Sequence, residues 1–102
     1  MKKLIIKPST LLSGDSVGEL EDAIEILKEV SEDQSVPKNI RRAAEDASKR
    51  LNGMEESISV KVNAATSLLD DVSSDPNMPF HTRTLIMEAA GLLESASRTK
   101  NI

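Results

Sequence analysis

A metal centre or an acid–base site in this chain would have to be built from carboxylates and a single histidine. The 102 residues include 17 Asp or Glu, one His at position 81 and no Cys. Four of the acids recur at helical spacing, on one face of their segment: Glu21, Glu25, Glu29 and Glu32. A carboxylate metal centre in a helical bundle needs Glu-x-x-His pairs that point into the core, whereas these acids lie opposite the apolar residues of their segment. The pattern is typical of a solvated helix face, with a weak divalent-cation site as the alternative.

The sequence predicts no catalytic, cofactor-binding or metal-binding residue. Without Cys there is no thiolate nucleophile, zinc knuckle or iron–sulfur cluster. The four glycines are scattered and form no phosphate-binding loop. No Ser stands in a nucleophile motif, although three-dimensional geometry decides whether a triad exists. His81 and Asn39 each follow a proline within one helical turn, where such side chains bond locally or face water. We therefore expect a protein that is not an enzyme.

A basic segment raises the question of nucleic acid. Residues 36–51 carry five basic and two acidic side chains, whereas residues 15–33 carry one basic and eight acidic ones. A basic face for RNA phosphates, as in a ribosome-associated protein, would comprise Lys38, Arg42, Lys49 and Arg50. The alternative is pairing within the helix at a spacing of four residues: Arg41–Glu45, Arg42–Asp46, Glu45–Lys49 and Asp46–Arg50. The net charge of −4 and the single Phe argue against extensive nucleic-acid binding and base stacking, so we rank this hypothesis second.

The last apolar segment has more hydrophobic residues than a surface helix needs. On a helical wheel its apolar arc covers about 160°, against about 100° for an ordinary surface helix. Phe80 and Met87 lie outside even this arc. We take four residues as a candidate protein interface: Phe80, Leu85, Met87 and Leu92. Two alternatives stay open, namely that this segment is the central helix of a compact bundle, or that the leader residues 4–6 fold over it.

Hydrophobic periodicity predicts an all-α fold with four helices. They run over about residues 17–32, 37–51, 59–73 and 79–97. Ser16 and Glu19 have the spacing of a capping box, and Pro37 and Pro79 stand where a first helical turn accepts proline. Asn52-Gly53 suggests a left-handed C-cap.

The chain repeats itself after 42 residues. ILKEVSEDQSVPKNIR (26–41) aligns without gaps on LLDDVSSDPNMPFHTR (68–83), so that Asp33 matches Asp75 and Arg41 matches Arg83. Recurrence of this Asp and Arg predicts a role in the fold, in which they cap the second helix of each hairpin and link neighbouring turns. The repeated helical hairpin is similar to a HEAT repeat, and a plain four-helix bundle is the alternative.

We expect one domain over residues 15–98, made of hairpins at about 15–53 and 57–97. The leader at 1–14 and the tail at 99–102 are expected to be loose. No run approaches the roughly 20 apolar residues that span a membrane. The start MKKLIIKP has too short an apolar run for a signal peptide, so we expect a cytoplasmic protein without a membrane partner.

Two motifs resemble those of a small archaeal family of uncharacterised proteins: VPKNIRRAA (36–44) and DPNMPFHTRTLI (75–86). The resemblance covers roughly residues 17 to 95. It implies an all-helical, cytoplasmic protein of about this length without an assigned activity, and it supplies no catalytic residue. Together with the apolar excess of residues 79–97, it favours a non-catalytic module for binding another protein or a second copy of itself.

Overall fold

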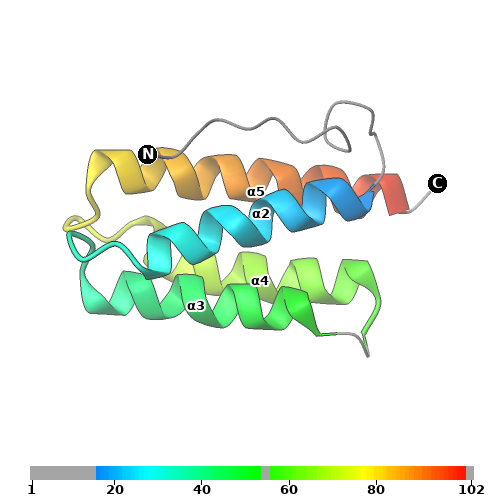
Figure 1. The fold of residues 1–102 in the computed structure, drawn as a ribbon, viewed down its shortest axis with the longest axis horizontal. Helices are drawn as coiled ribbons and strands as arrows, with labels where there is room; N and C mark the ends of the chain where they lie inside the picture. Colours follow the sequence, from blue (N-terminus) through cyan, green and yellow to red (C-terminus); the bar gives the residue numbers. More distant parts are fainter. Residues whose placement is uncertain (1–15, 54–55, 101–102) are drawn as a thin grey trace.

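The computed structural model describes residues 16–53 and 56–100, and every regular secondary-structure element in these residues is a helix (Figure 1). The helices are α2 (Ser16–Ser31), α3 (Lys38–Asn52), α4 (Ile58–Ser73) and α5 (Phe80–Lys100). The predicted fold class is therefore confirmed, with helix bounds within about three residues of those expected. The predictions about the leader and the last two residues lie outside the described residues.

The helices form a closed ring in which neighbours run antiparallel. Helix α2 packs against α3 and α5, and α4 packs against the same two helices, whereas no contact joins the diagonal pairs α2 and α4 or α3 and α5 within the described residues. Figure 1 shows α5 and α2 above α3 and α4. In a HEAT-like stack, the first helices of the two hairpins would lie side by side. The observed contacts are those of the four-helix-bundle alternative.

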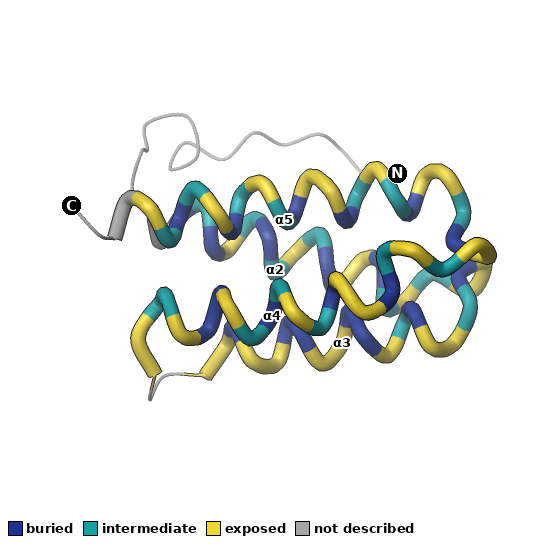
Figure 2. The backbone as a smooth tube through the Cα atoms, turned by 180° about the vertical axis from the view of Figure 1, so that it is seen from behind, coloured by how far each residue is buried: buried dark blue, intermediate teal, exposed yellow. Residues whose placement is uncertain are grey.

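The core is built from positions that match across the 42-residue repeat. In Figure 2 the buried positions recur along each helix on the side that faces the other helices. Leu27 and Leu69, Ala47 and Ala89, and Leu51 and Leu93 are all buried, as the repeat predicts. The pattern extends beyond the motif region, because Leu20 and Val62 as well as Ala23 and Ala65 are also buried. Each repeat therefore supplies half of one shared core.

The connections between the helices of each hairpin have the same hydrogen bonds. The backbone N–H of Asp33 donates to the carbonyl of Val30, and 42 residues later Asp75 donates to Val72 in the same way. The carboxylate Oδ1 of Asp33 accepts from the N–H of Ser35 at 2.9 Å, and that of Asp75 accepts from Asn77 at 2.8 Å. The duplication seen in the sequence is thus also a duplication of turn geometry.

The end of α3 differs from the expectation. Gly53 has φ −64° and ψ 146°, which is extended backbone rather than a left-handed C-cap. Its carbonyl accepts a hydrogen bond from Nζ of the buried Lys61 at 2.6 Å, so a side chain of α4 holds the chain in this conformation. Helix α4 has an N-cap that the sequence analysis missed, because the Ser57 hydroxyl accepts from the N–H of Val60.

A side-chain hydrogen bond links α2 to α5, because the carboxylate of Glu19 accepts from the Ser95 hydroxyl at 2.7 Å. The Ser16 side chain of the predicted capping box lies outside the described side chains. None of the helices in residues 16–53 and 56–100 is long and apolar enough to cross a membrane.

Candidate interaction surface

The outer side of α5 presents the two most exposed large hydrophobic side chains among the described residues. Phe80 is 82% exposed and Met87 is 67% exposed. They lie seven residues apart, which is two helical turns, and therefore share one face. The same face carries four more exposed residues, and we call the whole set the outer stripe of α5: Phe80, Thr84, Met87, Gly91, Glu94 and Arg98. This stripe lies opposite the residues with which α5 enters the core.

The structure divides the predicted interface into two pairs. Leu85 and Leu92 are only partly buried and pack against the core. The centre of the core-facing side is formed by buried residues: Thr82, Ile86, Ala89, Leu93 and Ala96. Leu85 and Leu92 therefore border the core, and only Phe80 and Met87 project from the outer stripe.

The wide apolar arc of α5 has an internal explanation. Because α5 packs against both α2 and α4, it needs apolar residues toward two neighbours. Phe80 and Met87 have no such explanation, since both are exposed at positions that face away from the bundle. The exposed pair, rather than the width of the arc, is the feature that points to a partner.

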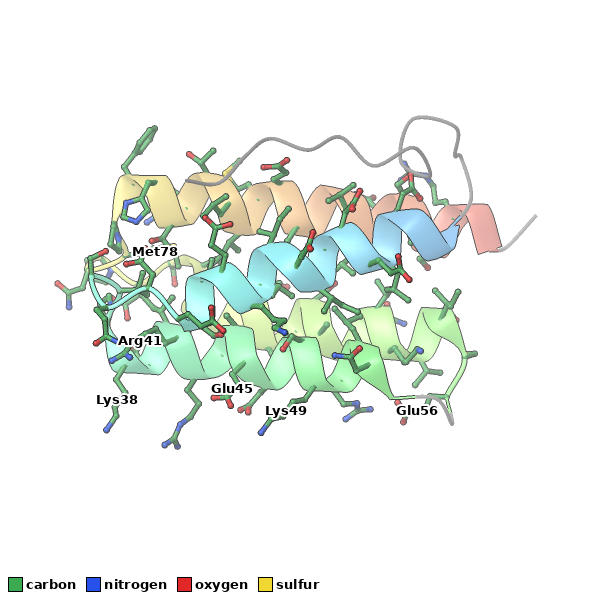
Figure 3. The ribbon with its side chains drawn as sticks, viewed as in Figure 1. Lys38, Arg41, Glu45, Lys49, Glu56 and Met78 are labelled. Atoms are coloured by element: carbon green, nitrogen blue, oxygen red, sulfur yellow. The ribbon has the colours of Figure 1, made fainter. Side chains whose placement is uncertain are left out.

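The predicted basic face lies on the outer side of α3. Lys38, Arg42, Lys49 and Arg50 are all exposed, and Figure 3 shows Lys38 and Lys49 projecting away from the bundle. Of the four expected intrahelical pairs, only Lys49–Glu45 lies within ion-pair distance, at 3.6 Å. Arg50 instead pairs with Glu56, at 3.1 Å, across the connection to α4. Acidic neighbours thus engage half of the predicted basic face.

Where the α2–α3 and α4–α5 connections meet, two hydrogen bonds join one hairpin to the other. Nε2 of His81 lies 2.9 Å from Oδ2 of Asp33, and Nδ2 of Asn39 donates to Oδ2 of Asp75 at 2.8 Å. The two bonds are equivalent under the 42-residue repeat, since His81 corresponds to Asn39 and Asp33 to Asp75. We call these four residues the polar clasp.

Hydrogen bonds lower the pKa of both carboxyl groups of the polar clasp. The pKa of Asp33 falls to about 2, first because the Ser35 hydroxyl donates to its carboxylate and second because of the bond to His81. The pKa of Asp75 is also lowered, chiefly by the Asn39 amide and then by the N–H of Asn77. Hydrogen bonds to a charged carboxylate favour the charged form, so both groups are held as anions.

The sequence pointed to the clasp residues and to part of their role. Asp33 and Asp75 were expected to cap the helix that follows them and to link neighbouring turns, and His81 and Asn39 to bond locally or face water. The link between the turns is observed, because each Asp receives a side chain from the opposite hairpin, from the exposed Asn39 or His81. The matched residues Arg41 and Arg83 stay within their own hairpins and donate to the carbonyls of Val36 and Ser73. The partners of each Asp, by contrast, could be identified only from the order of the helices around the ring.

The predicted acidic face comprises three residues on the outer side of α2 and Glu32, which directly follows the helix. Glu21, Glu25, Glu29 and Glu32 are all exposed. The described residues contain no group of three or more His, Cys, Asp or Glu side chains that could hold a metal ion.

Comparison with known proteins identifies relatives over most of the chain. A family model described as an uncharacterised protein family, UPF0147, matches residues 9–96. A UPF0147 protein of Methanothermobacter thermautotrophicus is 49% identical over 71 residues, which cover 70% of this chain and 70% of that protein. One of Pyrococcus horikoshii is 47% identical over 76 residues, covering 74% and 82%. The relative in Methanosarcina mazei is 37% identical over 83 residues, covering 81% and 89%.

A solved structure has the same fold. The crystal structure of a protein of unknown function, MMP1188, superposes with a TM-score of 0.73 at 42% sequence identity. The match covers 76% of this chain and 89% of the other. The four-helix arrangement is therefore shared with an experimentally determined relative.

Proposed function

The chain belongs to the UPF0147 family, whose description assigns no activity, and we propose that it is a non-catalytic module that binds a protein through the outer stripe of α5. The partner is either a second copy of the chain or another protein. The observation that carries the proposal is the exposure of Phe80 and Met87 on one face of a helix whose opposite face fills the core. Exposed aromatic and Met side chains are common at protein interfaces and adapt to varied partner surfaces.

Quantitative capture tests this proposal. The tagged full chain is used as bait in extract from cells that produce it, and the recovery of bound proteins is compared between the parent and a Phe80→Glu, Met87→Glu double variant. The control is Val60→Glu, which introduces one such acidic side chain at an exposed hydrophobic position on α4. We expect the double variant to lose captured proteins, its own untagged copy included, while the control retains them. Equal recovery from both variants, with unchanged helical circular dichroism, would refute the proposal.

A second candidate function rests on one specific observation. Lys38 and Arg42 are exposed on α3, and no ion pair engages either of them within the described residues. They could contact RNA phosphates, as in a ribosome-associated accessory protein. A Lys38→Glu, Arg42→Glu variant should then lose co-sedimentation with ribosomes, whereas Lys28→Glu on α2 should not. If the parent chain does not co-sediment even at low salt, this candidate is excluded.

A further inference from the structure

We infer that the outer stripe of α5 pairs in antiparallel orientation with the same stripe of a second copy of this chain. This inference rests on the proposed function and narrows its partner to the chain itself. The order of residues along the stripe identifies the partner, because the stripe of one copy fits the same stripe of a second copy that runs in the opposite direction.

The stripe has the spacing of a helix–helix seam. Its six residues are separated alternately by four and three positions, as at the a and d positions of two packed helices. Buried residues such as Ala89 and Leu93 occupy the opposite side of α5 and already pack within the chain. The outer stripe is therefore a second possible packing face of the same helix, and no other helix of the described residues packs against it.

The described part of the chain leaves the glycine at position 91 unexplained. Gly91 lies in the interior of α5, is exposed, and a Cβ atom placed there would meet no described atom within 4 Å. Glycine destabilises a helix interior relative to alanine, and no described residue near Gly91 requires its small size. A missing side chain does, however, leave room for a large side chain that arrives from outside.

Antiparallel pairing about the level of Ala89 brings such a side chain to Gly91. Met87 and Gly91 are equally far from Ala89 along the helix, so Met87 of each copy would lie over Gly91 of the other. The exposed Met87 of each copy would fill the space beside Gly91 of the other copy, so the same contact would occur twice in the symmetric dimer.

The other stripe residues agree with the same register. Phe80 would lie opposite Arg98 of the second copy, which allows a guanidinium–aromatic contact. Thr84 would lie opposite Glu94, and this carboxylate would also approach Arg83, the neighbour of Thr84. Parallel pairing would instead place each residue beside its own copy, with Glu94 near Glu94 and Arg98 near Arg98. Within one chain, however, Nη1 of Arg98 lies 3.2 Å from Oε2 of Glu94, so these two charges partly offset each other in either orientation. The fit of Met87 over Gly91 therefore selects the antiparallel arrangement, and the charges agree with it.

The first test measures mass against concentration by light scattering and sedimentation velocity on the full chain. We expect a monomer–dimer equilibrium, because two large apolar side chains per copy make a small interface. Met87→Glu should shift it to monomer, and so should Gly91→Gln, which fills the space without a clash inside the chain. Val60→Glu on α4 is the control and should leave the equilibrium unchanged.

The second test determines orientation. Because the chain has no Cys, single-cysteine variants report directly on proximity between copies. An equimolar mixture of Thr84→Cys and Glu94→Cys should form disulfide-linked dimers under mild oxidation, and either variant alone should do so far more slowly. Faster linkage of Thr84→Cys with itself would indicate parallel pairing and would overturn the inference.

The remaining outcomes separate this inference from the proposed function. A chain that is monomeric at every concentration overturns the inference, and stripe-dependent capture of a different protein would still uphold the proposed function. A dimer that appears only after deletion of residues 2–8 would also overturn it, because the leader would then be the occupant. A dimer that dissociates in high salt and tolerates Met87→Glu would also overturn the inference, because it would indicate that acidic α2 of one copy contacts basic α3 of the other.

Discussion

At the scale of single residues, the two repeats differ most sharply at one core position. Ile40 in α3 and Thr82 in α5 are 42 residues apart, and both are fully buried. The Thr82 hydroxyl Oγ1 has no hydrogen-bond partner within the described residues. A buried polar group without a partner loses its hydration without compensation, so this hydroxyl weakens the fold.

Replacing Thr82 by Val should therefore stabilise the protein. Val keeps the shape of the side chain and removes the unpartnered hydroxyl, and we expect the free energy of unfolding to rise by about 1 kcal/mol. Chemical denaturation of the variant and parent measures this change. The control is Thr84→Val, whose hydroxyl is exposed and donates to the Phe80 carbonyl at 3.2 Å. A loss of stability in Thr82→Val would show that the hydroxyl has a partner in the folded protein.

The hydrogen bonds that Asp33 accepts from Ser35 and His81 give stability a defined pH dependence. Asp33 has a folded pKa of about 2, below its ordinary value of 3.8, so its charged form stabilises the fold. This contribution is complete above the unfolded pKa and is lost as pH falls from about 5 toward 2. In Asp33→Asn, melting temperature should consequently fall less steeply over this window than in the parent. Asp71→Asn, at an exposed position on α4, should keep the parent slope.

At the scale of helices, α5 combines two faces with different requirements. Its inner face must pack against two neighbouring helices, whereas none of the other described helices packs on the outer stripe. Gly91 belongs to the outer stripe, and no packing among residues 16–53 and 56–100 offsets its cost to the helix.

Substituting Gly91 by Ala should stabilise the isolated fold by about 0.5–1 kcal/mol, because alanine favours the helix and its Cβ meets no atom. The measurement is thermal or chemical unfolding at the lowest usable concentration, where association contributes least. Gly53→Ala is the comparison, since a Cβ there would lie 3.3 Å from the Arg50 carbonyl oxygen. We expect it to gain less, and equal gains would contradict the argument from local space.

The helices could be predicted from sequence because apolar periodicity and prolines are local signals. Their order around the ring could not, because the same repeat is compatible with a HEAT-like stack and with a closed bundle. For the same reason, only two of the four candidate interface residues could be placed correctly from the sequence. Phe80 and Met87 were distinguishable as lying outside the apolar arc, whereas Leu85 and Leu92 could be assigned to the edge of the core only once α2 and α4 were placed beside α5. A link between the two turns could be predicted from the recurring Asp33 and Asp75, whereas their partners could be identified only from the order of the helices around the ring.

At the scale of the whole molecule, the two hairpins are equivalent halves of one core. Each contributes matching buried residues, and the clasp bonds connect the halves in both directions. A single hairpin of about 40 residues buries too little surface to be stable alone. Stability is therefore a property of the pair.

Fragments cut between α3 and α4 should reveal this dependence. Residues 1–53 and 54–102, prepared separately, should each show little helicity by circular dichroism, and an equimolar mixture should regain it. The comparison is each fragment alone at the same total concentration. Strong helicity in either fragment alone at low concentration would show that a hairpin folds independently.

The duplicated clasp also affects how the ring of four helices closes in a concentrated solution. Since each hairpin presents the same kind of surface to the other, a hairpin from a neighbouring molecule offers nearly the same contacts as the one tethered by the short segment between α3 and α4. The tethered hairpin prevails only because the covalent connection raises its effective concentration above that of hairpins in neighbouring molecules. During synthesis or refolding at high density, exchange of hairpins between molecules would thus compete with closure and would produce interlocked dimers whose every contact is native.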